Sequence, residues 1–142
     1  MNKYNNKIVE YKNIKFHSQM ELDFYLHLLK LKEEGVVKEI ILQPKFELQP
    51  AYVKNGRKVR RIDYVGDFHV IYADGKEEVI DVKGQELPLF LLKKKILEYK
   101  YPFELKTVTM SKIDGGFIEL SELKKARKER KKLKDINKSN KI

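Results

Sequence analysis

The sequence predicts a single α/β domain in which a mixed central β-sheet is flanked by helices and followed by a basic C-terminal helix or tail. The main observation is the order of the expected elements: a helix, three to five strands, a second helix, one more strand and a basic helix. The chain has 142 residues, of which 42% are hydrophobic, and this is enough for one core. A strand, a helix and a further strand late in the chain also favour a right-handed βαβ unit.

The first expected helix lies near the N-terminus. Residues 1–15 are polar and rich in Asn and Lys, so a loose arm with room for a short strand is expected there. A helix is expected over His17–Glu34, where Ser18 can serve as N-cap and Gly35 ends the helix. Apolar residues recur at helical spacing at Leu22, Tyr25, Leu26 and Leu29.

Strands are expected through the middle of the chain, separated by Pro, Asn-Gly and Asp-Gly signals. The predicted strands are Val36–Leu42, Phe46–Val53, Val59–Tyr72 and Glu77–Lys83. Pro50 breaks the second strand or places it at a sheet edge. Turns are expected at Asn55-Gly56 and at Ala73-Asp74-Gly75.

The C-terminal third supplies the second helix, the last strand and a charged helix. Pro88 suits the first position of a helix that runs to about Lys100, and Pro102 stops it. Phe103–Met110 alternates as a strand, and residues 114–116 turn the chain. Ser121 to about Asp135 is expected to be a helix with little apolar face.

The chain is strongly basic, with 31 Lys and Arg against 21 Asp and Glu, a net charge of +10. From Glu119 onward there are ten Lys and Arg and four Asp and Glu, a net of +6. We therefore divide the chain into a body, residues 1–118, and a basic helical or disordered tail, residues 119–142. Such charge favours a polyanionic partner, usually nucleic acid, although basic tails also occur as merely solvated ends.

Composition excludes several classes of protein. There is no Cys, so disulfides and Cys-ligated zinc are excluded. No stretch approaches the ~20 apolar residues of a membrane span, and the N-terminus lacks the apolar run of a secretory signal. We therefore expect a cytoplasmic protein without membrane contacts.

The segment Ile80-Asp81-Val82-Lys83-Gly84 has the pattern of a catalytic strand end. Because side chains alternate along a strand, Asp81 and Lys83 share one face, while Ile80 and Val82 can pack on a core. An Asp can bind Mg²⁺, and a Lys can orient an attacking water, help deprotonate it or offset charge on a phosphate. So short a motif is more often an exposed Asp/Lys pair without chemistry.

Asp67 interrupts an apolar strand, where an Asp is out of place. The turn at residues 73–75 decides what it faces. A two-residue loop would set Asp67 opposite Val82, whereas a three-residue loop with Gly75 left-handed would set it opposite Asp81. Both loop types accept Asp-Gly. In the second register the two carboxylates would repel each other unless a divalent cation lay between them.

Glu21 is the third acidic candidate. Ser18 and Glu21 have the spacing of a capping box, in which Glu21 would only close back on the Ser18 backbone. At that helix end it could instead complete a metal site beside the sheet. Asp63, on the same strand face as Asp67, is a reserve candidate. The histidines do not have the spacing of metal ligands: His17, His27 and His69.

These residues resemble the PD-(D/E)xK nuclease superfamily, with Glu21 on the first helix, Gly66-Asp67 on a strand and Asp81-Val82-Lys83 after a turn. Within that superfamily the chain looks most like small phage-encoded Holliday-junction-resolvase-like proteins. The resemblance spans roughly residues 11–101 and implies a restriction-endonuclease-like core. Its longer blocks are Tyr11–Ser18, Leu42–Phe46, Asp67-Phe68, Asp81–Gly84 and Leu92–Lys95.

The resemblance implies hydrolysis of DNA phosphodiester bonds with Mg²⁺ as cofactor and Mn²⁺ as a substitute. Four side chains would be catalytic: Glu21, Asp67, Asp81 and Lys83. The metal would be held by Asp67, Asp81, the Val82 carbonyl and Glu21, and the lysine would position the attacking water. The chain departs from the family pattern twice, because Gly66 stands where Pro is commoner and Asp81 where Glu is commoner.

Basic residues near the motif are candidates for DNA phosphate contacts: Arg57, Lys58, Arg60, Arg61, Lys93 and Lys94. The first four would otherwise belong to an ordinary solvated edge strand. Lys93 and Lys94 share the apolar stripe of their helix and would otherwise snorkel to solvent.

Among nuclease roles we favour resolution of branched DNA in phage or mobile-element recombination, in the host cytoplasm if the protein is phage-encoded. Symmetrical cutting of two strands implies a homodimer. The alternatives are a nicking or double-strand nuclease without branch selectivity and a DNA-binding protein without catalysis. The sequence shows no base-reading motif, so recognition of shape or backbone is expected.

Overall fold

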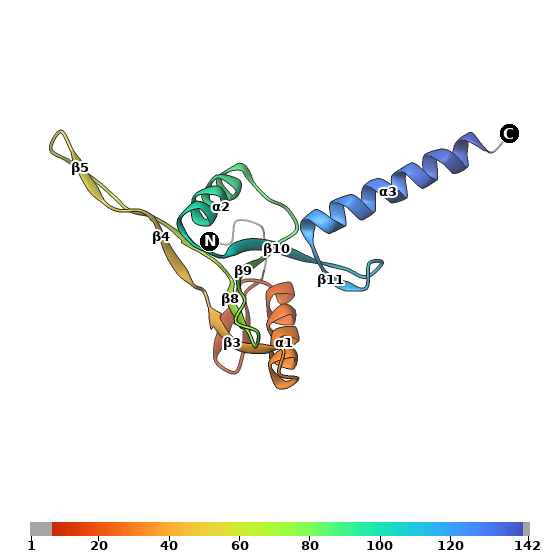
Figure 1. Cartoon of the computed structure of the whole chain (residues 1–142), viewed down its shortest axis with the longest axis horizontal. Coiled ribbons are helices and arrows are strands. Elements are labelled where there is room, and N and C mark those ends of the chain that lie inside the picture. The colour runs from red at the N-terminus through yellow and green to blue at the C-terminus, as the bar shows by residue number, and fades with distance from the viewer. Residues whose placement is uncertain (1–6, 141–142) are drawn as a thin grey trace.

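A mixed five-stranded sheet lies at the centre of the molecule (Figure 1). The computed structural model describes residues 7–140. The sheet order is β11 (Gly116–Glu119), β10 (Glu104–Ser111), β9 (Glu77–Val82), β8 (Phe68–Tyr72) and β3 (Val37–Leu42). β9 and β10 are parallel, and the other neighbours are antiparallel. The expected α/β class with a mixed central sheet is confirmed.

Helices flank this sheet. The helix α1 (Gln19–Glu33) packs with the hairpin of β1 (Val9–Tyr11) and β2 (Ile14–Phe16), whereas α2 (Pro88–Lys100) lies on the other side of the sheet (Figure 1).

The two faces of the sheet form separate cores, and the alternation of β9 explains why. Ile80 and Val82 join Phe16 and Leu28 in the core under α1, as their predicted face requires. Val79, which precedes Ile80 and points to the opposite face of the sheet, joins Leu97 of α2. Because the helix α2 connects two parallel neighbours, β9 and β10, the expected βαβ unit is confirmed.

Local signals fix the ends of both helices. The Ser18 hydroxyl accepts a hydrogen bond of 3.1 Å from the Glu21 N–H, and Gly35 follows α1 with a φ of +82°. Pro88 stands at the start of α2, as expected, and Lys100 is its last residue.

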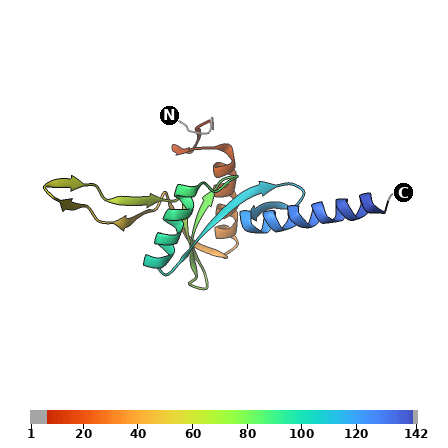
Figure 2. The ribbon, with the colours of Figure 1, turned by 90° about the horizontal axis from the view of Figure 1, so that it is seen from above.

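A long two-stranded extension, here called the β-arm (residues 45–65), projects from the body (Figures 1 and 2). It consists of β4 (Lys45–Gln49) paired with β7 (Ile62–Val65), and of β5 (Tyr52–Lys54) paired with β6 (Arg57–Val59). Its tip is the expected Asn55-Gly56 turn, in which both residues have positive φ, 50° and 76°.

The prediction of one strand over Val59–Tyr72 is wrong. The run is divided into β6, β7 and β8, with breaks at residues 60–61 and 66–67. The second break lies at Asp67, whose side chain and backbone bond to groups outside the strand ladder, as described below.

The turn between β8 and β9 is the three-residue loop. The Tyr72 N–H donates to the Lys76 carbonyl at 2.8 Å, and Gly75 has a φ of +89°. The register of β8 on β9 pairs Phe68 with Ile80, so the next position brings Asp67 opposite Asp81. Of the two registers that the sequence left open, the one that brings these carboxylates together is therefore present.

Other elements differ from expectation. A hairpin, β1–β2, occupies part of the expected loose arm, and β11 was not expected. The charged helix α3 (Leu120–Ser139) runs longer than predicted. The first six residues of the expected arm and the last two of the tail lie outside the described residues. Within residues 7–140, no helix combines the length and the apolar character needed to cross a bilayer.

Candidate active site

A cavity of about 340 Å³ opens where the N-terminus of α1 meets the β7–β8 junction and the end of β9. The first turn of α1 supplies one side chain, the strand break supplies another, and β9 with the residue after it supplies two. All four side chains predicted to be catalytic line this cavity: Glu21, Asp67, Asp81 and Lys83. The structure therefore brings together residues that are up to 62 positions apart in the sequence, from 21 to 83.

Two reciprocal hydrogen bonds lock Asp67 to the end of β9. The Asp67 N–H donates to Asp81 Oδ1 at 2.9 Å, and the Val82 N–H donates to Asp67 Oδ2 at 2.8 Å. These side-chain bonds take the place of ladder bonds, which explains why the strand breaks at this point.

Asp81 is buried, with 4% of its surface exposed, and its second oxygen is also occupied. Asp81 Oδ2 accepts a hydrogen bond from the Tyr64 hydroxyl and lies 3.2 Å from Lys83 Nζ. The same ammonium lies 3.7 Å from the centroid of the Phe90 ring. Lys83 is thereby held between a carboxylate and an aromatic face.

Ser18 and Glu21 form only one of the two hydrogen bonds of a capping box. The Glu21 N–H is capped by Ser18, but the Glu21 carboxylate is 5% exposed and lies 3.6 Å from His17 Nδ1. Among the described residues, the Ser18 N–H donates no hydrogen bond to this carboxylate. Burial raises the pKa of Glu21, and His17 opposes the increase.

Asp67 is the most perturbed acid of the site. Burial first, and then the charges of Asp81 and Glu21, raise its pKa to about 8. Three carboxyl groups thus share one cavity, and Lys83 can compensate their charge only in part. Such an arrangement favours a bound cation.

The donor set fits a divalent metal ion. Ligand atoms of His17, Glu21 and Asp67 lie within 4.8 Å of one another. Carboxylate oxygens suit Mg²⁺ and Mn²⁺, and an imidazole is a common additional ligand of transition metals. Asp81 is not part of this group, because its carboxylate faces Tyr64 and Lys83. Val82 also lines the cavity.

His17 is a residue that the sequence analysis missed. The histidines were not expected to have the spacing of metal ligands, but the His17 side chain, which is 66% exposed, lies close enough to Glu21 and Asp67 to be a candidate ligand. The signal that could have found His17 is its position just before the Ser18 N-cap, four residues before Glu21, which brings both side chains to the start of α1.

The other histidines and the reserve carboxylate lie elsewhere. His69 is 3.4 Å from Glu77, away from the cavity, and His27 packs against Phe24. Asp63 bonds to Arg61 at 2.9 Å, and this contact, with Lys45 nearby, lowers the pKa of Asp63. Asp63 does not line the 340 Å³ cavity, but it lines a neighbouring cavity together with Asp81 and Lys83.

Gly66 was predicted as a departure from the family pattern, and its neighbours explain it. A Cβ on Gly66 would lie 2.8 Å from Val79 Cγ1, and its N–H donates to the Pro44 carbonyl at 2.9 Å. A proline there would lose this donor as well as the space. Gln43, with a φ of +48°, also lines the cavity and was not predicted as a site residue.

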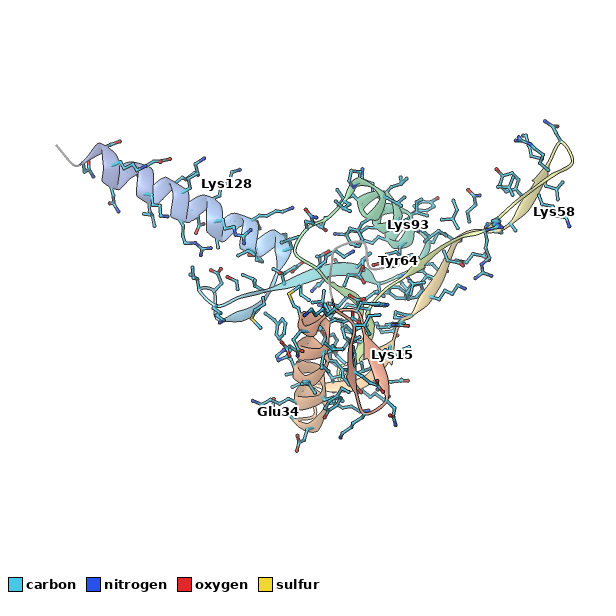
Figure 3. The ribbon with its side chains drawn as sticks, turned by 180° about the vertical axis from the view of Figure 1, so that it is seen from behind. Lys15, Glu34, Lys58, Tyr64, Lys93 and Lys128 are labelled. Carbon is cyan, nitrogen blue, oxygen red and sulfur yellow. The ribbon has the colours of Figure 1, made fainter. Side chains whose placement is uncertain are left out.

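The predicted DNA-binding residues fall into two groups (Figure 3). Arg57, Lys58 and Arg60 are exposed on the β-arm, and none forms an ion pair within the described part of the chain. Arg61 is engaged with Asp63 and Glu47.

The two lysines of α2 differ in their surroundings. Lys93 donates to the Asp63 carbonyl at 3.1 Å and lines a second cavity of about 440 Å³, which shares Asp81 and Lys83 with the first. Lys94 is half-buried and lines neither cavity.

The fold and the cavity define an α/β protein with a cluster of buried carboxylates and one lysine at a sheet end. The chain belongs to the family described as "Protein of unknown function (DUF1064)", whose model matches residues 1–114. This match includes every residue of the cavity and ends before α3. No curated protein and no solved structure matches the chain.

Proposed function

We propose that this chain is a metal-dependent DNA endonuclease with a restriction-endonuclease-like core of the PD-(D/E)xK type. The observation that carries the proposal is the convergence of Glu21, Asp67, Asp81 and Lys83 on one cavity. Buried carboxylates without enough cations are costly to a fold, so their presence together favours a functional site over a structural one.

Mg²⁺ is the proposed cofactor, with Mn²⁺ as a substitute. When bound, the cation would offset charge on the phosphate and make water a better nucleophile. Asp67 and Glu21 would hold it, with His17 at the mouth. Asp81 and the Val82 carbonyl remain proposed ligands on the adjoining wall.

The chain's own groups would perform the remaining tasks. Lys83, oriented by Asp81 and Phe90, would position the attacking water and stabilise negative charge on the phosphate. Tyr64 would hold the Asp81 carboxylate in place, because burial and Asp81 raise the pKa of its hydroxyl and keep the donor protonated. The Asp67–Asp81 hydrogen bonds would fix the strand ends that carry these groups.

The proposed substrate is branched DNA, cut by a homodimer in phage or mobile-element recombination. The test is cleavage of a labelled four-way junction and a matched linear duplex with Mg²⁺, by wild type and by Lys83→Ala. We expect cutting of the junction, lost in the variant. Equal cutting of both substrates would keep the nuclease and reject branch selectivity, leaving a nicking or double-strand nuclease. Intact DNA in every Mg²⁺ and Mn²⁺ reaction would reject the nuclease.

A DNA-binding protein without catalysis is the second candidate, favoured by the net charge of +10. It predicts DNA binding that is independent of Mg²⁺ and is unchanged in Asp81→Asn, with no cleavage. The nuclease predicts that Asp81→Asn loses cleavage and alters the Mg²⁺ dependence of binding.

A further inference from the structure

Within residues 7–140, the helix α3 is attached to the body through its first half, from Leu120 to Arg130. Leu120 and Leu123 are buried, and Arg130 forms a double hydrogen bond with Asp114, with Arg130 Nη1 2.8 Å from Asp114 Oδ1. These contacts fix the direction of the helix. The remainder projects into solvent on the opposite side of the body from the β-arm (Figures 1 and 2).

Most of the positive charge of α3 is not paired with an acidic side chain in the described part of the chain. Between Leu120 and Ser139 there are nine Lys and Arg and three Asp and Glu, a net of +6. Lys124 lies 3.6 Å from Glu86, and Lys125 lies 3.5 Å from Glu122. Six others form no ion pair within 4.0 Å in residues 7–140: Arg127, Lys128, Lys131, Lys132, Lys134 and Lys138.

The chemistry of α3 discriminates among polyanions. A membrane-surface helix needs a broad apolar face, and the projecting part offers only Leu133 and Ile136 as large exposed apolar side chains. Single-stranded nucleic acid is bound by stacking on aromatic rings, and α3 contains no aromatic residue. A helix that presents cations but has neither a broad apolar face nor aromatic rings is suited to contact the closely spaced phosphates of a duplex.

We propose that α3 is a second DNA-binding surface, which contacts the phosphate backbone of a duplex segment other than the one the β-arm contacts. A helix of 20 residues is about 30 Å long, close to one turn of B-DNA. This inference rests on the proposed function only in taking DNA as the polyanion. It specifies that the bound DNA has at least two duplex segments, one on each side of the cavity.

The test is a salt titration of DNA binding by the full chain in EDTA, where no cleavage occurs. The variant is Lys128→Gln/Lys131→Gln/Lys132→Gln, because Gln removes charge while keeping a side chain of similar helix propensity. The control, Lys30→Gln/Lys32→Gln/Lys38→Gln, removes the same charge from exposed positions around the C-terminal end of α1, where Figure 3 labels Glu34. Circular dichroism verifies that both variants retain their helices.

We expect the slope of log K against log salt for a duplex of about 30 base pairs to become shallower by about 2 to 3 in the α3 variant, since each phosphate contact contributes about 0.9. The control should retain the wild-type slope. An equal change in both variants would show that only net charge matters and overturn the proposal.

A membrane role for α3 would give a different pattern. Unchanged DNA binding, with lost binding to vesicles of phosphatidylserine and phosphatidylcholine, would also overturn the proposal. Cleavage by wild type in Mg²⁺ is scored separately. A shallower slope in the α3 variant without cleavage by wild type would reject the nuclease and keep α3 as a DNA-binding surface. Cleavage by wild type with an unchanged slope in the α3 variant would keep the nuclease and reject α3 as a DNA-binding surface.

Discussion

The Asp67 carboxyl group makes the stability of the metal-free chain depend on pH. Its pKa is raised from 3.8 to about 8, so between these values the folded state holds a proton that the unfolded state has lost. The free energy of unfolding therefore falls as pH rises through this window. We expect wild type to lose stability relative to Asp67→Asn between about pH 5 and about pH 8, measured by urea unfolding in EDTA. A difference that does not change with pH would contradict this.

The Tyr64 hydroxyl donates a hydrogen bond to the buried Asp81 carboxylate. Tyr64→Phe removes one donor from a buried carboxylate, which we expect to lower the free energy of unfolding by about 1–3 kcal/mol. Denaturant titration measures the loss. Tyr99→Phe is the control, because Tyr99 on α2 is 91% exposed. Equal stability of Tyr64→Phe and wild type would mean that Asp81 finds another donor at no cost.

The close approach of β7 to β9 at Gly66 is a property of two elements together. Gly66→Ala would place a methyl group 2.8 Å from Val79 Cγ1, and we expect a loss of about 1–3 kcal/mol in the free energy of unfolding. Gly84→Ala is the matched control, because no atom of residues 7–140 lies within 4 Å of a Cβ at Gly84. A thermal unfolding series that also contains Val79→Ala and the double variant should show that the two substitutions couple favourably. Simple additivity would argue against the steric cause.

Elements that carry their own local signals were predictable from the sequence. The Ser18 cap, the Pro88 helix start and the Asn55-Gly56 turn each depend on residues within one turn of chain, and all three are present. The sequence predicted a turn at Asp74-Gly75 but did not decide its loop length. Both loop lengths accept Asp-Gly, and the pairing of β8 with β9 along their length selects one of them.

Long-range contacts account for what the sequence could not predict. The break at Asp67 arises because side chains of Asp67 and Asp81 replace ladder bonds, which no local pattern shows. The β1–β2 turn uses Lys12 and Asn13 at φ of 48° and 66°, and Lys is not a usual residue for this conformation. His17 joins Glu21 and Asp67 only because the sheet end lies beside α1.

At the scale of the whole molecule, two basic extensions leave the body on opposite sides. The β-arm from Lys45 to its tip at Lys54 spans about 33 Å, and α3 spans about 30 Å. A duplex of about 10 base pairs is about 34 Å long, so it can contact one extension at a time but not both.

This geometry predicts how losses in the two extensions combine. On a four-way junction with long arms, Arg57→Gln/Lys58→Gln in the β-arm and the triple Gln variant of α3 should weaken binding independently, so their free-energy losses add. On a duplex of about 10 base pairs, either set alone should have little effect because the other extension still binds, and only the combined variant should lose affinity. Fluorescence anisotropy in EDTA measures all four proteins. Losses that add on the short duplex as well would mean that both extensions contact the same segment, and the two-segment arrangement would be wrong.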